Sequence, residues 1–369
     1  MTNLSFNQLN NYFRNNDFTK IENDNKGIRF LKLRSMSRKA TMEDFCEIHN
    51  IDVSDLNARD YFSHIFNLDA ITDEQINEFI NLKYREERLE RVDNQDYLID
   101  QLNRLAHFDW GGSFGNSLEK NIVNNYVKKI QSYEKINEEI EGNLLSSLRG
   151  YTLNSWYNHW TSILIEDLFK DHQTVLPTIG LVKKIDFFIN DIPFDLKVTY
   201  FPEQLLADKL RDIGYGNELT MLKRICRNLN IFIPSDLKPK ELKLHLYNIV
   251  SEDPRQEAKD FIANLKEQKG NIIAEAEKNP TELKKWFYEN QGEARFDASN
   301  RFFLVLTDET DMSNSWKLKR NIVFLSENIN NHLNDLAMDM SSLDTEFYWI
   351  GDQRTYNCKS DILFLKYSR

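Results

Sequence analysis

Two aspartates and a lysine stand in one short segment of the chain at a spacing that could do chemistry: Asp186, Asp195 and Lys197. Between the aspartates lies Asn190-Asp191, and both residue types tolerate the positive φ of a two-residue hairpin turn. A turn there places Asp186 directly across from Asp195, where like charges repel by about 0.2–1 kcal/mol. A divalent cation between the carboxylates would turn that repulsion into attraction, and hard oxygen ligands suit Mg²⁺.

The same register predicts which side chains share a face of the hairpin. Side chains alternate along a strand, so one face is expected to be apolar and to consist of Ile185, Phe187, Ile189, Ile192, Phe194 and Leu196. Lys197 follows Asp195 by two residues and therefore lies on the opposite face, beside both carboxylates.

A solvated hairpin face with a weak Asp–Lys pair, worth ~0–1 kcal/mol, is the alternative interpretation. It explains the apolar face equally well. It gives no reason for two aspartates in the middle of strands, where Asp is depleted.

An acid followed on the next strand by acid-x-Lys is the PD-(D/E)XK pattern. The segment resembles the active-site hairpin of the restriction-endonuclease-like nucleases, with Asp186 as the first acid and Asp195-Leu196-Lys197 as the second half. Ile185 stands where the name of the motif has proline. The resemblance covers the hairpin and its flanks, and it implies an α/β (α+β) fold with an αβββαβ core around a mixed central sheet.

The resemblance also implies roles for individual residues. Asp186 and Asp195 would bind Mg²⁺, with the backbone carbonyl of Leu196 as a further ligand. Lys197 would orient or deprotonate the attacking water, or stabilise the developing charge.

In the nucleases that this hairpin resembles, the preceding helix often supplies a third acid. A helix is expected from Thr152 to Lys170, because Trp156, Trp160, Leu164 and Leu168 form an apolar stripe. Glu166 in this helix is the candidate third acid and metal ligand. A solvated glutamate is the alternative interpretation.

Taken together, the resemblance implies a Mg²⁺-dependent endonuclease that hydrolyses double-stranded DNA, most similar to a type II restriction endonuclease and acting as a homodimer. Two alternatives stay open. One is a DNA-binding protein without catalysis. The other is a repair or defence nuclease of the same fold that is gated by a partner.

Four regions are expected along the chain. Residues 1–150 are mostly helical, 151–216 form the first half of the core, 217–299 form a helical insertion, and 300–369 complete the core. The run 301–307 is apolar throughout, which is typical of a central strand covered on both faces. Further strands are expected at 175–182, 346–350 and 361–367, helices at 202–214, 219–229, 239–250 and 315–336, and a loop at 110–117.

Two stretches rich in cations could grip DNA phosphates. The first, 26–39, contains Arg29, Lys32, Arg34, Arg38 and Lys39, but residues 28–33 also suit a solvated loop or edge strand. The second is a helix–loop–helix over 219–250 with Lys223, Arg224 and Arg227 on its rim. Its alternative is a pair of amphipathic helices with ordinary solvated cations.

Composition narrows the class of protein. The net charge of −11 over 369 residues argues against a protein that coats nucleic acid indiscriminately. No stretch approaches the ~20 apolar residues of a membrane span, and residues 1–16 lack an apolar signal core. Three widely spaced cysteines favour a reduced, cytoplasmic setting and no cysteine-based metal site.

Overall fold

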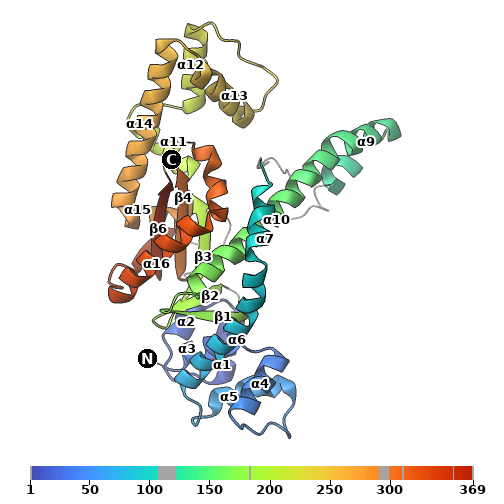
Figure 1. Cartoon of the computed structure of the whole chain (residues 1–369), viewed down its shortest axis with the longest axis vertical. Helices are drawn as coiled ribbons and strands as arrows, with labels where there is room; N and C mark the ends of the chain where they lie inside the picture. The colour runs from blue at the N-terminus through green and yellow to red at the C-terminus, as the bar shows by residue number, and fades with distance from the viewer. Residues whose placement is uncertain are drawn as a thin grey trace.

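The fold is described from a computed structural model of the chain, which covers residues 2–106, 122–182, 184–290, 299–309, 311–351 and 353–367. Its centre is a mixed sheet with the strand order β1-β2-β3-β4-β6-β5 (Figure 1). The strands are β1 (Val175–Val182), β2 (Ile185–Ile189), β3 (Ile192–Tyr200), β4 (Arg301–Asp308), β5 (Asp344–Trp349) and β6 (Arg354–Tyr367).

Two strands of the sheet run against the other four. β2 is antiparallel to its neighbours β1 and β3, β4 is parallel to both β3 and β6, and β5 closes the far edge antiparallel to β6. Every residue of β4 is buried, so the prediction of a central strand over 301–307 is confirmed.

The hairpin of β2 and β3 has the predicted register. Phe187 pairs with Phe194 and Ile189 with Ile192. Both turn residues adopt positive φ, 47° at Asn190 and 64° at Asp191. These φ values are those that the predicted two-residue turn requires.

Helices cover both faces of the sheet. On one face α10 (Leu145–Lys170) and α16 (Ile322–Met338) pack against even-numbered residues of β3 and β4. On the other face lie α11 (Glu203–Asp212), α14 (Gln256–Lys278) and α15 (Pro280–Asn290), which pack against odd-numbered residues of β4. The predicted boundary after residue 150 falls inside α10.

The N-terminal region is helical, as expected, over its described residues. Capping boxes start two of its helices, from Ser5 with Gln8 and from Thr72 with Gln75. Its helices are α1 (Phe6–Arg14), α2 (Phe18–Glu22), α3 (Gly27–Ser35), α4 (Lys39–Ile48), η1 (Ala58–Asp60), α5 (Tyr61–Asn67), α6 (Asp73–Asp93), α7 (Gln95–Asn103), η2 (Val123–Val127), α9 (Tyr133–Glu139) and η3 (Ile140–Leu144). The predicted loop at 110–117 lies outside the described residues.

The first of these helices pack against the outer end of the sheet. Their core includes Ile179, Val182, Ile185 and Phe188 from β1 and β2. Ile185 therefore does not share a core with the other five residues of the predicted apolar face. Strand alternation places Phe188 on the face opposite Phe187, and there it is buried beneath the N-terminal helices.

Two further expectations need correction. Residues 28–33 form neither a loop nor an edge strand, because they lie within α3, where Phe30, Leu31 and Leu33 are all fully buried. The expected helix over 315–336 is divided: a 3-10 segment, η4 (Met312–Arg320), precedes α16.

The expected helix–loop–helix is present as α12 (Glu218–Asn228) and α13 (Pro239–Glu252). These helices form a separate core with the start of α14, which includes Leu222, Cys226, Leu246 and Ile262. Among the described residues, no helix combines the length and apolar character that crossing a bilayer requires.

Candidate active site

The hairpin brings its three predicted side chains together. The β2–β3 pairing ends at Phe187 and Phe194, and Asp186 and Asp195 are the next residues along the two strands. The backbone N–H of Leu196 donates a 2.7 Å hydrogen bond to Asp186 Oδ2. The N–H and carbonyl of one strand residue point to the same side, so the carbonyl of Leu196 is directed toward β2 and Asp186 as well.

Asp195 lies between two cations. Lys197 Nζ is 2.5 Å from Asp195 Oδ1, and Arg301 Nε is 3.8 Å from Oδ2. The Asp195 side chain is 11% exposed, whereas that of Lys197 is 37% exposed. Lys197 therefore pairs with the buried carboxylate while its side chain stays partly exposed.

Asp186 is the acid with the most perturbed ionisation. Burial, together with the negative charges of Glu166 and Asp195, raises its pKa from 3.8 to about 7. The hydrogen bond from Leu196 and the charge of Lys170 act in the opposite direction. An acid that would be ionised in water is thus close to half protonated near neutral pH.

Glu166 is within electrostatic range of Asp186, but a lysine holds it. Lys170 Nζ lies 2.5 Å from Glu166 Oε1, one helical turn away on α10. The same ammonium group donates to the carbonyl of Thr178 on β1, and the Thr178 hydroxyl donates to the carbonyl of Asp186 at 2.7 Å. This chain of contacts fixes α10 against β1 and β2 beside the acids.

The donor set suits a hard dication, although the acids are not gathered around one point. Within the described residues, no three His, Cys, Asp or Glu side chains form a ready-made metal site. Asp186, Asp195 and Glu166 nevertheless repel one another enough to raise the pKa of Asp186. A cation bound by oxygen ligands would relieve this repulsion.

Two residues of this site were missed in the sequence, Lys170 and Arg301. Lys170 follows Glu166 by four residues, the spacing of a helical ion pair. Arg301 opens the most apolar strand, and its side chain is 1% exposed. A charged residue at the start of a buried strand requires a partner. This requirement was the signal in the sequence that could have identified Arg301.

The basic residues predicted to contact DNA do not form one surface. Arg29 donates to the carbonyls of Ile71 and Leu68 and pairs with Asp73 at 2.9 Å. The side chain of Lys32 is 1% exposed and pairs with Asp191. Both cations lie inside the protein, so the prediction that they bind phosphate is corrected.

The other candidates are more accessible. Arg34 is partly buried over the ring of Phe13, whereas Arg38 and Lys39 are exposed at the start of α4. On α12, Lys223 is partly exposed and both Arg224 and Arg227 are exposed.

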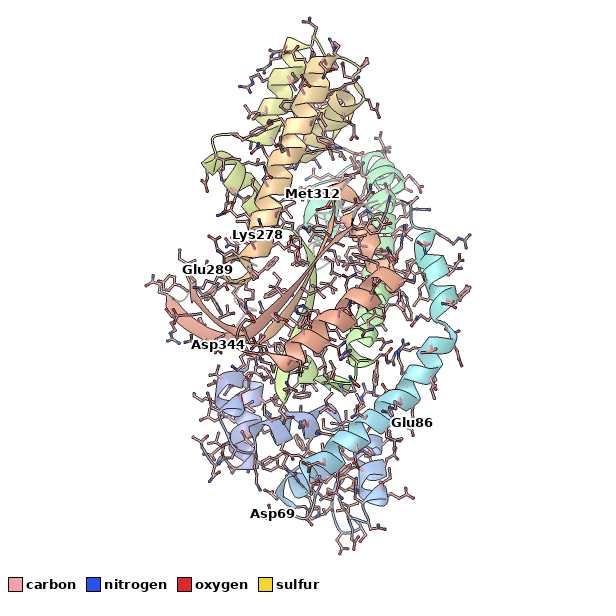
Figure 2. All side chains as sticks on the ribbon, turned by 60° about the vertical axis from the view of Figure 1, so that its left-hand side comes forward. Asp69, Glu86, Lys278, Glu289, Met312 and Asp344 are labelled. Carbon is pink, nitrogen blue, oxygen red and sulfur yellow. The ribbon has the colours of Figure 1, made fainter. Side chains whose placement is uncertain are left out.

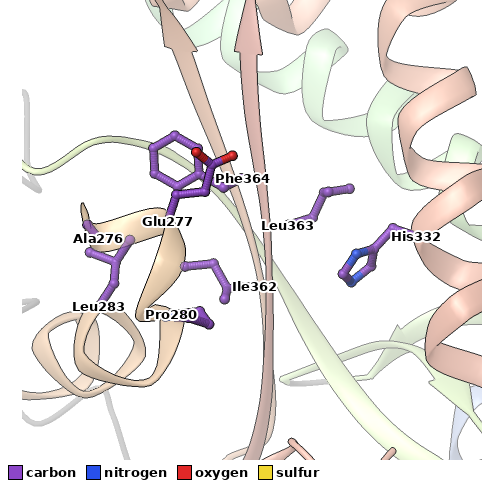
Figure 3. Close-up of a pocket in the computed structure, with 8 residues that line it drawn as sticks. All are labelled: Ala276, Glu277, Pro280, Leu283, His332, Ile362, Leu363 and Phe364. Carbon is purple, nitrogen blue, oxygen red and sulfur yellow. The ribbon is translucent and has the colours of Figure 1, made fainter. Parts of the chain in front are cut away.

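A small pocket of about 190 Å³ lies elsewhere, around β6. Figure 3 shows Glu277 and Ile362 on one side of the strand and His332 on the other. His332 Nε2 lies 2.6 Å from Asp361 Oδ2. The three hairpin residues do not line this pocket.

Comparisons with known proteins found no match to this chain, whether among protein-family models, curated proteins or solved structures. The assignment of function therefore depends on the residues and their geometry alone.

Proposed function

We propose that this protein is a Mg²⁺-dependent endonuclease that hydrolyses DNA phosphodiester bonds, most similar to a type II restriction endonuclease. The observation that carries the proposal is the acid pair across the hairpin, with Lys197 bound to Asp195 and Leu196 bound to Asp186.

The order of elements supports the same proposal. The helix α10 precedes three antiparallel strands, α11 follows them, and β4 then joins the sheet parallel to β3. This sequence of elements and directions is the one that an αβββαβ core of a restriction-endonuclease-like nuclease would have. The helices α12 to α15, between α11 and β4, form the insertion.

Each residue has a task in phosphodiester hydrolysis. Asp186, Asp195, Glu166 and the Leu196 carbonyl would be the oxygen ligands that hold Mg²⁺. When bound, the metal supplies Lewis acidity and lowers the pKa of water. Binding requires ionised carboxylates, so Asp186 must lose its proton and Glu166 must turn from Lys170. Lys197, whose side chain is partly exposed, donates to an oxygen of the scissile phosphate and stabilises its developing charge.

The test is digestion of plasmid DNA with Mg²⁺ and with a chelator. Discrete fragments with Mg²⁺ are expected, because a restriction enzyme cuts at fixed sequences, whereas a smear would indicate a nonspecific nuclease. Lys197→Ala should lower the rate at least about 100-fold. Lys366→Ala is the matched control, since Lys366 is also a strand lysine, 30% exposed and 2.6 Å from Glu277. Equal cleavage by Lys197→Ala and wild type would refute the proposal.

A DNA-binding protein without catalysis is the second candidate. It is favoured by the two lysines that already neutralise Glu166 and Asp195 at 2.5 Å, because such a cluster is satisfied without a metal. A gel shift that persists in chelator, with no cleavage under any divalent cation, would support this candidate.

A further inference from the structure

The helices α12 and α13 and the loop between them, residues 217–252, form a module at the far end of the molecule. In Figure 1 they lie beyond the sheet, at the opposite end from α4 and α5. In Figure 2, Lys278 marks the end of α14 nearest the strands, and the module is at the other end of that helix. Its separate hydrophobic core, which includes Leu222, Cys226 and Leu246, keeps it folded away from the sheet.

The charge of this module differs from that of the chain. Residues 217–252 contain six lysines and arginines and four acids, and only one of these acids, Asp236, lies between residues 219 and 240. The whole chain has 47 lysines and arginines and 58 acids. A local excess of cations on an acidic protein marks a surface for a polyanion.

The cations of α12 occupy one side of the helix. Leu222, Ile225 and Cys226 face the module core, which leaves the outward side to residues 223, 224 and 227. Arg224 and Arg227 are both exposed. Two nearby lysines already form ion pairs within the protein, Lys269 with Glu218 and Lys243 with Glu203.

The loop after α12 adds an exposed aromatic ring. Ile231 and Ile233 pack against the module core, while Phe232 between them points outward and is 79% exposed. The loop backbone is held in place, because the N–H of Ile231 donates to the carbonyl of Cys226 at 2.7 Å and Arg255 Nη1 donates to the carbonyl of Leu229 at 2.7 Å. Phe232 is thus presented outward from an anchored segment.

We infer that α12 and the loop that follows it bind double-stranded DNA, with Arg224 and Arg227 on the phosphates and Phe232 against the sugars and base edges of a groove. Exposed arginines combined with an anchored apolar side chain are the features used to grip the backbone and wedge against a base step. This inference deepens the proposed function, on which it rests for its substrate, and gives the enzyme a binding surface far from the acids.

The experiment measures binding of a mixed-sequence DNA duplex by the full-length protein in chelator, as a function of salt. Arg224→Ser combined with Arg227→Ser should weaken binding about tenfold or more and lower the slope of log K against log salt by about 2. Phe232→Ser should weaken binding and leave the slope unchanged, because no charge is lost. All three residues are exposed, so the thermal midpoint should not change.

The matched control is Arg59→Ser combined with Arg85→Ser, which removes two exposed cations from the N-terminal region and should leave affinity unchanged. The inference is overturned if the α12 variants bind as wild type, if the control loses as much affinity, or if an RNA duplex competes better than DNA. Cleavage is not measured in chelator, so failure here is distinct from failure of the nuclease proposal, which the plasmid digest decides.

Discussion

Lys32, on the buried helix α3, forms a 2.6 Å ion pair with Asp191 in the turn of the β2–β3 hairpin. The lysine side chain is 1% exposed and the aspartate 66% exposed. The N-terminal helices thus hold the tip of the hairpin that carries the candidate catalytic residues. Lys32, which was predicted from the sequence to bind DNA phosphate, is instead paired with Asp191 of the protein itself.

The first prediction separates the charge of Lys32 from its packing. Lys32→Ala should lower the free energy of unfolding by about 2–4 kcal/mol, because it removes both a buried stem and the pair. Lys32→Met keeps the stem and should cost about 1 kcal/mol or less, since Asp191 can be solvated. Chemical denaturation measures both. Neither change should weaken DNA binding, and a loss of affinity in folded Lys32→Met would restore the original interpretation.

The second prediction concerns the pH dependence of stability. The pKa of Asp186 is raised to about 7 in the fold, so the folded state holds a proton that the unfolded state has released. The stability from this group is therefore full below pH 4 and falls as pH rises toward 7, by up to about 1.4 kcal/mol per pH unit.

Asp186→Asn should remove this fall in metal-free protein, and the difference from wild type isolates the group. Urea denaturation at several pH values between 4 and 8 is the measurement. Asp344→Asn, which changes an 85% exposed carboxylate, should keep the wild-type profile. Parallel profiles for wild type and Asp186→Asn would show that Asp186 ionises normally.

The third prediction tests the link through Lys170. Lys170→Met leaves Glu166 without its partner and breaks the contact to Thr178, so stability should drop by about 1–3 kcal/mol. The pKa of Asp186 should rise further, because the charge of Lys170 lowers it, and the fall in stability should extend to higher pH. Lys20→Met breaks the exposed 2.7 Å pair with Asp17 and should have little effect. An unchanged pH profile in Lys170→Met would argue against this electrostatic link.

The fourth prediction concerns the contact between β1 and the N-terminal helices. A Cβ on Gly180 would lie 2.4 Å from the carbonyl oxygen of Ser35. Gly180→Ala should therefore destabilise the protein by about 1–3 kcal/mol, because one backbone must move away from the other. Gly270→Ala on α14 meets no atom within 4 Å and should stabilise by about 0.5–1 kcal/mol. Equal melting temperatures for the two variants would contradict this close approach.

Local signals in the sequence predicted the hairpin, the central strand β4, and the helices α12 and α13 of the insertion. The turn residues Asn190-Asp191 predict the register of the hairpin without information from elsewhere in the chain. The apolar run of β4 predicts a strand that is covered on both faces. The site residues Asp186, Asp195 and Lys197 follow from the same turn.

What the sequence could not predict depends on partners that are distant in the chain. Helix α3 is buried on nearly all sides, so it has no polar face, and its short apolar run suited an extended strand equally well. Arg29 and Lys32 resembled surface cations because Asp73 and Asp191 are brought to them only by the fold. The positions of Lys170 and Arg301 beside the acids likewise require tertiary packing.

Strands β3 and β4 are neighbours in the sheet, yet β3 ends at Tyr200 and β4 begins at Arg301. During synthesis the β2–β3 hairpin and all the helices between β3 and β4 are therefore made before β4, the strand that pairs with β3. Until then the hydrogen-bonding edge of β3 has no neighbour, and such edges invite aggregation. A chain truncated before residue 301 should thus be insoluble.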